Sequence, residues 1–308
     1  MSTVYRHIAL EPGAPHEKYF GWRVLREEPR LKLIMLRRGP IRRCLLLVAG
    51  LTDAEIGKLV LEEKLLDPRT DLFLHDYQDQ GRETREIGGR LWRPAGAGLR
   101  LLNIATFVFD LHQDDDALRA AMSPDYRRKL RRANDAGLEV VEDQAPPPEV
   151  FGEFMGRFEA MARERGLGAF PYSVAQRMFA AGDLSLFRVR AGDGVRTAAT
   201  VYQAGDKAIF MTGVRAEKRN DGSGQLLHFE IMRALRARGV CWYDFGGVPT
   251  LDESNGIYQF KKGFGGKLLS LGTEYVYRPP AVAALAASMA WLSWGADFLK
   301  FRPASATR

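Results

Sequence analysis

The chain has 308 residues, a length that suits two medium-sized domains. Hydrophobic residues make up 46% of it and charged residues 27%, so the composition supports a packed core and excludes wholesale disorder. A formal net charge of +7 favours an anionic partner such as nucleic acid, phosphate or an acidic membrane surface. The two cysteines, Cys44 and Cys241, form neither a disulfide framework nor a zinc motif, so we expect a reducing, cytoplasmic setting.

Neither end of the sequence predicts a membrane-spanning segment. Residues 1–13 lack the apolar stretch of a signal peptide. Residues 281–296 are apolar, but they are fewer than the roughly 20 residues that a spanning helix needs. We expect a docking or membrane-surface helix there, in a monomer that is soluble or peripherally membrane-associated.

Strand-like runs alternate with helical ones in the first half, which is typical of an α/β fold. Thr52 and Glu55 have capping-box spacing, and Pro124 after Ser123 is favoured in the first turn of a helix. The sequence predicts strands over 32–36, 44–48, 72–74, 105–111 and 138–141, and helices over 53–66, 115–122 and 124–137.

The run from Gln144 to Pro148 predicts a domain boundary, because consecutive prolines continue neither a helix nor a central strand. Beyond it the sequence predicts a helix ending at Gly166, strands over 184–190, 197–203 and 207–214, a helix over 223–238 and a buried strand over 240–245. The first half has a looser version of this order, so we expect two copies of one α/β module.

Two segments favour phosphate chemistry. Residues 126–133 place five cations on less than two helical turns, either as a solvated basic face or as a contact for nucleic acid or phosphate. Residues 219–224, Arg-Asn-Asp-Gly-Ser-Gly between a strand and a helix, resemble the pyrophosphate loop with which GNAT acyltransferases bind coenzyme A. An ordinary Asp-Gly turn with a helix N-cap is the alternative for this second segment.

A third segment combines aromatic, cationic and glycine residues. The strand Trp-Tyr-Asp-Phe-Gly-Gly-Val (242–248) is followed by Gly-Ile-Tyr-Gln-Phe-Lys-Lys-Gly-Phe-Gly-Gly (256–266). Glycines let a backbone approach a ligand closely, and adjacent lysines can stabilise developing negative charge or hold a phosphate. A basic surface loop is the alternative.

This third segment resembles the Fem family of aminoacyl-tRNA-dependent peptidyltransferases. Residues 36–40, 106–111 and 137–140 resemble further family segments in the same order, so the similarity spans roughly residues 18 to 280. It implies two tandem GNAT-like domains with mixed sheets flanked by helices. We expect the first to comprise residues 1–145 plus about 275–308, and the second, residues 146–274, to carry the acyl-donor site.

The family likeness implies transfer of an amino acid from aminoacyl-tRNA to an acceptor amine, forming an amide bond without a bound cofactor. The acceptor would be a peptidoglycan precursor, a small peptide or a natural product. The spacing around Tyr172 departs from the family pattern for the precursor's phosphates, so the resemblance does not imply the precursor in particular. An acyl-coenzyme A-dependent N-acyltransferase and a non-catalytic tRNA- or membrane-binding protein remain as alternatives.

The likeness also assigns roles to single residues. Lys261 would stabilise the oxyanion or contact the tRNA end, and Phe260 would pack beside the terminal adenosine. Asp244 and Tyr258 would act as proton or amine partners, with a turn-capping role at the end of its strand as the alternative for Asp244. Further donor contacts are expected from Lys262, Phe264, Gly265, Arg219, Gly222 and Gly224, and acceptor or phosphate contacts from Arg37, Arg38, Arg127, Arg128, Arg131 and Tyr172.

The histidines do not predict a metal site. None of the five has metal-ligand spacing or accompanies a nucleophile motif, and we expect His228, within the 223–238 helix, to be structural.

Overall fold

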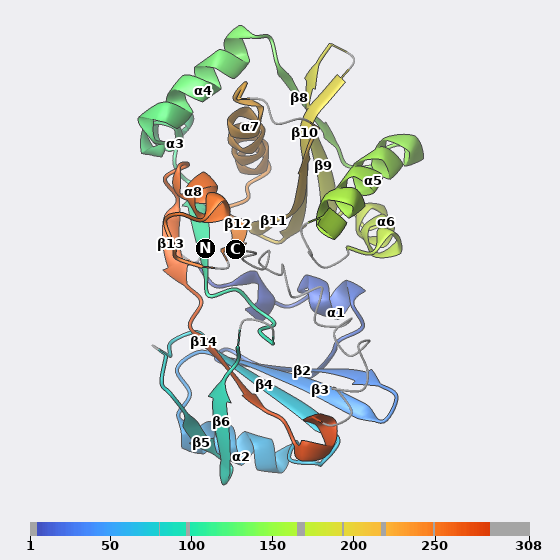
Figure 1. Cartoon of the computed structure of the whole chain (residues 1–308), viewed down its shortest axis with the longest axis vertical. Helices are drawn as coiled ribbons and strands as arrows, with labels where there is room; N and C mark the ends of the chain where they lie inside the picture. The colour runs from blue at the N-terminus through green and yellow to red at the C-terminus, as the bar shows by residue number, and fades with distance from the viewer. Residues whose placement is uncertain are drawn as a thin grey trace. The chain divides into compact units, whose positions relative to one another are not determined.

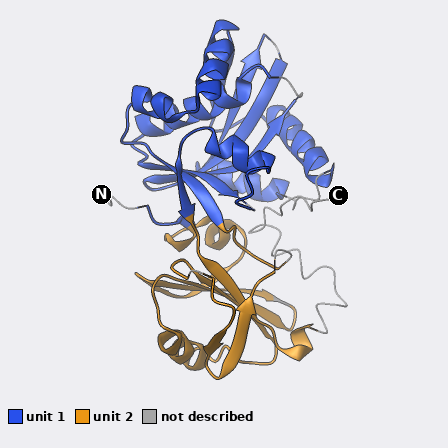
Figure 2. Ribbon diagram, turned by 60° about the vertical axis from the view of Figure 1, so that its left-hand side comes forward, with its two compact units in different colours: residues 1–8, 105–269, 303–308 blue, residues 9–104, 270–302 orange. Residues whose placement is uncertain are grey.

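The computed structural model describes residues 5–79, 81–96, 99–164, 170–192, 194–216, 220–248 and 250–283. The chain divides into two compact units (Figure 2): unit 1 comprises residues 1–8, 105–269 and 303–308, and unit 2 comprises residues 9–104 and 270–302. Each unit holds one seven-stranded mixed sheet flanked by helices (Figure 1). The expected α/β class with two modules is therefore confirmed.

Unit 2 has the strand order β1-β2-β3-β4-β14-β6-β5. Strands β3 and β4 are parallel because α2 crosses between them, whereas the neighbouring pairs are antiparallel. The capping box of Thr52 and Glu55 forms at the start of α2, as predicted. After the short 3-10 turn η1 (Ile8–Leu10), the elements are α1 (Pro15–Tyr19), β1 (Arg23–Glu28), β2 (Leu31–Arg38), β3 (Ile41–Val48), α2 (Asp53–Glu62), β4 (Thr70–Asp76), β5 (Arg85–Ile87), β6 (Arg90–Pro94) and β14 (Thr273–Tyr277).

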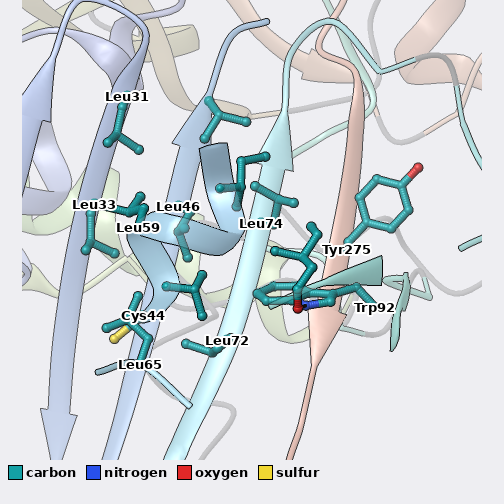
Figure 3. Close-up of a cluster of buried hydrophobic side chains, with 14 residues drawn as sticks. Leu31, Leu33, Cys44, Leu46, Leu59, Leu65, Leu72, Leu74, Trp92 and Tyr275 are labelled. Atoms are coloured by element: carbon teal, nitrogen blue, oxygen red, sulfur yellow. Dashed lines mark hydrogen bonds between the residues drawn. The ribbon is translucent and has the colours of Figure 1, made fainter. Parts of the chain in front are cut away.

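The core of unit 2 lies on both faces of its sheet. On the α2 side, leucines of the central strands pack with Trp92 and Tyr275 (Figure 3). Alternate residues of the same strands, such as Ile34 and Phe73, fill a second cluster. Since both faces are covered, the strands read as nearly continuous apolar runs in the sequence.

Unit 1 has the strand order β13-β7-β12-β11-β10-β9-β8. Figure 1 shows α5 and α6 on one side of this sheet and α7 on the other. Its elements are β7 (Ala105–Asp110), α3 (Asp115–Ala121), α4 (Pro124–Asp135), β8 (Glu139–Asp143), α5 (Pro148–Glu164), α6 (Tyr172–Ala180), β9 (Leu184–Ala191), β10 (Gly194–Ala204), β11 (Lys207–Arg215), α7 (Ser223–Ala237), β12 (Trp242–Val248), α8 (Gly256–Lys262) and β13 (Lys267–Ser270).

The units divide at residues 104/105, not at 145/146 as the proline run predicts. Strand β7 pairs with β12 and β8 pairs with β9, so the segment before the prolines belongs to the sheet of unit 1. Pro148 begins α5, where a helix tolerates a missing N–H. At the other end, β14 pairs with β4 and β6, so the last strand joins the first sheet, as the family likeness implies.

The apolar segment 281–296 near the C-terminus is described only in its first three residues. The helix expected over 281–296 lies, beyond residue 283, outside the described residues. Within the part of the chain that the structure describes, no helix combines the length and the apolar character needed to cross a membrane.

Candidate functional site

The two parallel central strands of unit 1 separate along their length. Strands β11 and β12 pair over only three positions, Lys207 to Ile209 with Trp242 to Asp244. The register of β11 with β10 shifts between Phe210 and Thr212, and that of β12 with β7 shifts between Asp244 and Gly247. Such bulges bend strands and increase their twist. Beyond Ile209 and Asp244 the two strands therefore no longer share hydrogen bonds.

Lys261 reaches the bulge of β12 from α8. Its Nζ donates hydrogen bonds to the carbonyl oxygens of Gly246 (2.8 Å) and Gly247 (2.9 Å). It lies 5.8 Å from the ring centroids of Phe210 and of Phe245, which adds cation–π attraction. The residue is 7% exposed, and this burial lowers the pKa of its amine to about 7, although nearby Asp244 acts in the opposite direction. Near neutral pH, amine and ammonium forms therefore coexist.

Asp244 holds the β12 bulge together. Its Oδ2 accepts a hydrogen bond from the Tyr5 hydroxyl, and its Oδ1 accepts from the Thr106 hydroxyl and from the Gly246 N–H (2.8 Å). Gly246 has a φ of 72°, and a Cβ there would meet the Phe210 carbonyl oxygen at 3.0 Å. Asp244 is thus a buried turn-forming residue, 1% exposed, which accepts three hydrogen bonds from within unit 1.

His228 lies in an aromatic cage behind Lys261. Its ring centroid is 5.2 Å from that of Phe210, 4.3 Å from Phe245 and 5.5 Å from Phe264. Its Nδ1 lies 3.1 Å from the Tyr243 hydroxyl oxygen. Burial, reinforced by Lys261, lowers the pKa of His228 to about 3, so the ring is neutral at physiological pH. This environment agrees with the structural role expected from the sequence.

The aromatic residues of the signature segment have different exposures. Phe260 is half-buried, with its ring stacked at 6.1 Å on Phe245, and keeps an accessible part. Phe264 is fully buried, so the donor contact expected of it is corrected: it packs in the core. Tyr258 is also buried, beside Phe107. Lys262 is exposed and its Nζ lies 2.5 Å from a carboxylate oxygen of Glu253.

The glycines of residues 263–266 serve internal packing. A Cβ on Gly263 would meet the Tyr126 ring at 2.5 Å, and one on Gly266 would meet the Phe109 ring at 2.7 Å. Gly265 has a φ of 78°, and its Cβ would collide with the carbonyl of Ala121. Gly265 therefore packs closely against the end of α3 on the side of its Cβ position, while the residue is exposed, and its donor contact stays a prediction.

The first turn of α7, predicted as a pyrophosphate loop, is sealed within unit 1. Ser223, Gly224 and Gln225 are buried, and the Ser223 N–H donates to Asp221 Oδ1 (3.0 Å). Gly222 has a φ of 82° and abuts the backbone of α4. Gly222 and Gly224 thus face protein, which corrects their predicted diphosphate role; Arg219 lies outside the described residues.

Most cations of α4 already have partners within the protein. Arg127 donates to the carbonyls of Ala120 (3.0 Å) and Met122 (2.6 Å), so it caps the end of α3. Arg128 and Lys129 both pair with Asp125. Arg131 is exposed and has no hydrogen bond or ion pair with any described residue. It is therefore the cation of this helix most available to a phosphate.

The remaining predicted contacts are spread over both units. Tyr172 is half-buried in α6, with its ring 4.8 Å from that of Phe151. Arg37 is exposed on β2 of unit 2, and its Nε donates to the Gly39 carbonyl (3.4 Å). Arg38 also lies on β2, and its side chain is outside the described part of the structure.

Sequence reasoning missed Thr106 and Tyr5, which complete the network around Asp244. Thr106 carries a recognisable signal, since it is a hydroxyl residue directly before the apolar run Phe107 to Phe109 of strand β7. Tyr5 has no comparable local signal. For metals, no group of three or more His, Cys, Asp or Glu among the described residues is placed to hold an ion.

Comparison with known proteins shows which fold the chain shares. Residues 120–262 match the family model of an acetyltransferase (GNAT) domain. A search of curated proteins finds no match. The crystal structure of FemX is similar with a TM-score of 0.60 and 14% identity, covering 90% of this chain and 92% of that one.

Two further solved structures have the same overall fold. The C-terminal domain of a protein titled as a lysylphosphatidylglycerol synthetase from Agrobacterium fabrum has a TM-score of 0.56 and 16% identity, covering 91% of each chain. L-PGS from Bacillus licheniformis has a TM-score of 0.56 and 12% identity, covering 92% of each chain. The protein therefore has the tandem GNAT-like fold of these structures. Its Fem-like architecture, expected from the motifs, is confirmed at the level of the fold.

Proposed function

We propose that the protein transfers an aminoacyl group from aminoacyl-tRNA to an acceptor amine at the β12 bulge of unit 1. The observation that carries the proposal is the buried Lys261 amine, held by the carbonyls of Gly246 and Gly247 beside the two diverging strands. A buried titrating group with defined partners is typical of functional sites. The Fem-like fold and the signature segment supply the reaction type.

The chemistry needs little beyond alignment and charge stabilisation. The amino acid arrives as an activated ester, so attack by an amine requires neither ATP nor a metal. Alignment of the two reactants alone can lower the barrier by about 7 kcal/mol or more. The ammonium form of Lys261 has one hydrogen beyond the two given to the carbonyls, and that hydrogen is available to an oxyanion.

The half-buried ring of Phe260 suits the terminal adenosine of the donor. Like Phe210, it is a partly exposed member of the aromatic cluster around His228. Stacking of a base on an aromatic face contributes about 1–3 kcal/mol and tolerates any base. Exposed Arg131 on α4 would meet a phosphate of either substrate.

The sealed start of α7 favours tRNA over coenzyme A as the donor. Binding of a diphosphate at a helix N-terminus requires open N–H groups. Here the first-turn residues Ser223, Gly224 and Gln225 are buried, and a carboxylate already occupies the Ser223 N–H. The acyl-coenzyme A alternative would require α4 to leave this end of α7.

The acceptor is proposed by class. We expect an amine of a small peptide, a natural product or a peptidoglycan precursor, in a cytoplasmic monomer. The likeness to a domain titled as part of a lysylphosphatidylglycerol synthetase adds a lipid headgroup, which would fit a peripheral membrane contact.

Donor competition tests the proposal. The purified protein is incubated with total tRNA charged with ¹⁴C-amino acids or with ¹⁴C-acetyl-coenzyme A. The acceptors are a mixture of dipeptides, a lysine-containing muramyl pentapeptide nucleotide, and phosphatidylglycerol vesicles. We expect labelled product from charged tRNA and none from acetyl-coenzyme A. Product from acetyl-coenzyme A alone would establish the rival transferase, and tight tRNA retention without product would indicate a non-catalytic binder.

A further inference from the structure

The nitrogen of Lys261 makes two hydrogen bonds to the described part of the protein, which leaves one of its four tetrahedral positions without a hydrogen-bond partner there. An amine nitrogen is tetrahedral: Cε occupies one position, and the hydrogens donated to Gly246 and Gly247 occupy two. The fourth position carries a lone pair in the neutral amine and a hydrogen in the ammonium. The two carbonyls thus fix the direction in which Lys261 can accept or give a proton.

Thr106 helps to fix the position of the Lys261 amine. Its hydroxyl oxygen contacts Asp244 Oδ1 and lies 3.0 Å from the Gly246 carbonyl oxygen, which is one of the two acceptors of Lys261. Asp244 in turn binds the Gly246 N–H. Thr106 therefore touches both the carboxylate that fixes the turn and the carbonyl that receives the lysine. Thr106 is fully buried, so if its hydroxyl were removed, solvent water would not supply the lost hydrogen bonds.

We propose that Lys261 carries the proton that the transfer reaction moves, and that Thr106 is the positioning residue that orients Lys261 for this task. The proposal rests on the proposed function and adds a proton-transfer role to it. It gives Thr106, which sequence motifs do not single out, a measurable effect on the reaction.

The proton balance closes without a further reactant. The lone pair of the acceptor amine forms the new C–N bond at the ester carbonyl, which becomes a tetrahedral intermediate. The attacking nitrogen releases a proton to the lone pair of neutral Lys261. The ester C–O bond then breaks, and the ammonium of Lys261 gives the same proton to the departing ribose oxygen. Lys261 ends the cycle neutral, as it began.

The groups that face Lys261 support this assignment. Asp244 on β12 is occupied by hydrogens from Tyr5, Thr106 and Gly246. His228 on α7 is neutral and contacts the Tyr243 hydroxyl. From β11 the contact is the ring of Phe210. An acid–base group works best when its pKa lies near the operating pH, and burial places the pKa of Lys261 at about 7.

The first test is the pH dependence of turnover in Thr106→Val and Thr106→Ser. In the wild type, the single-turnover rate, divided at each pH by the fraction of acceptor amine that is unprotonated, should rise tenfold per pH unit below about pH 7, where the Lys261 amine is protonated, and level off above it. Thr106→Val removes the hydroxyl, so the Gly246 carbonyl is held less firmly and the Lys261 amine becomes less strictly buried. The midpoint should therefore move up by about one pH unit or more. Thr106→Ser keeps the hydroxyl and should retain the wild-type midpoint. Thr197→Val, which removes a buried hydroxyl bond to Val214, is the control and should also keep it.

The second test follows the lysine without any substrate. In protein labelled with ¹³Cε-lysine, the resonance that is missing in Lys261→Gln should titrate near pH 7 in the wild type and at least one unit higher in Thr106→Val. If Thr106→Val fails to fold, Tyr5→Phe removes another donor to Asp244 and should shift the midpoint in the same direction.

The outcomes separate the inference about Lys261 and Thr106 from the proposed aminoacyl transfer. A wild-type Lys261 midpoint above pH 9, or an unchanged midpoint in the folded Thr106→Val and Tyr5→Phe variants, would overturn the inference. A shifted midpoint with transfer from acetyl-coenzyme A alone would instead remove the proposed function and leave the positioning of Lys261 by Thr106 standing.

Discussion

At the scale of single residues, the site depends on where a lysine is buried. Lys261 and Lys262 are neighbours in the sequence. Lys261 is buried among carbonyl groups and aromatic rings, whereas Lys262 is exposed and forms an ion pair with Glu253. The dibasic motif predicts two cations near a substrate. It could not predict their difference, because the difference arises from α8: successive helical residues point about 100° apart, so only one of the two faces β12.

The burial of Lys261 predicts a pH-dependent stability. Its pKa of about 7 in the folded protein lies below the unfolded value of 10.5, so the unfolded chain binds more protons between these values. Stability should therefore rise from pH 7 to 10.5, and this contribution should stay constant below pH 7. Between pH 7 and 9.5 the free energy of unfolding of the wild type should gain about 3 kcal/mol relative to Lys261→Met.

Urea denaturation at the two pH values measures this gain. Lys267→Met, which replaces an exposed lysine of the same unit, should behave like the wild type. A constant difference between wild type and Lys261→Met at both pH values would show that Lys261 stays charged in the folded protein.

At the scale of elements, the signature segment is a helix and a packed turn. The sequence predicts a ligand-binding bend over 256–266, but residues 256–262 form α8 because Asn255 Oδ1 caps it by accepting from the N–H groups of Ile257 and Tyr258. Predictions that rest on local patterns, such as the capped α2 and α4, are confirmed. The purpose of the glycines depends on α3, α4 and β7, which are distant in the sequence.

The packing of Gly265 predicts a large loss of stability on substitution. In Gly265→Ala the new methyl group would collide with the Ala121 carbonyl, in addition to the strain of a φ of 78°. Gly205→Ala is the matched control, since Gly205 has a φ of 57° but no atom within 4 Å of a Cβ. We expect a loss of about 1 kcal/mol for Gly205→Ala and of at least 3 kcal/mol for Gly265→Ala in thermal or urea unfolding. Equal losses would mean that the glycine is needed only for its φ, which would leave room for a ligand at this turn.

At the scale of the whole molecule, strand pairing over long sequence separations sets the units. The proline run at 146–148 predicts a boundary because it interrupts regular structure. The interruption is only a local one, between β8 and α5 of the same unit. The decisive contacts are those of β7 with β12 and of β14 with β4 and β6, which no local pattern reveals. The number of modules could be predicted from the sequence, but the residue at which they divide could not.

The unit boundary predicts which fragment folds. Residues 105–271 contain every strand of the unit 1 sheet, whereas residues 146–274 lack β7, β8 and the helix α4 that covers α7. We expect the longer fragment to show dispersed amide resonances and cooperative unfolding. The shorter one should lack both, because β9 and β12 would lose their outer partners. Cooperative unfolding of the fragment 146–274 would instead support a division at the prolines.

The transfer rate of Lys261→Met tests the account most directly. Met nearly preserves the volume of the side chain and removes the amine, so the packing around His228 is retained while the reacting group is lost. In single-turnover reactions with ¹⁴C-aminoacyl-tRNA and the acceptor found in the donor competition, we predict a rate at least about a hundredfold below the wild type, with tRNA affinity changed much less. A Lys261→Met rate equal to that of the wild type would contradict the assignment of this site.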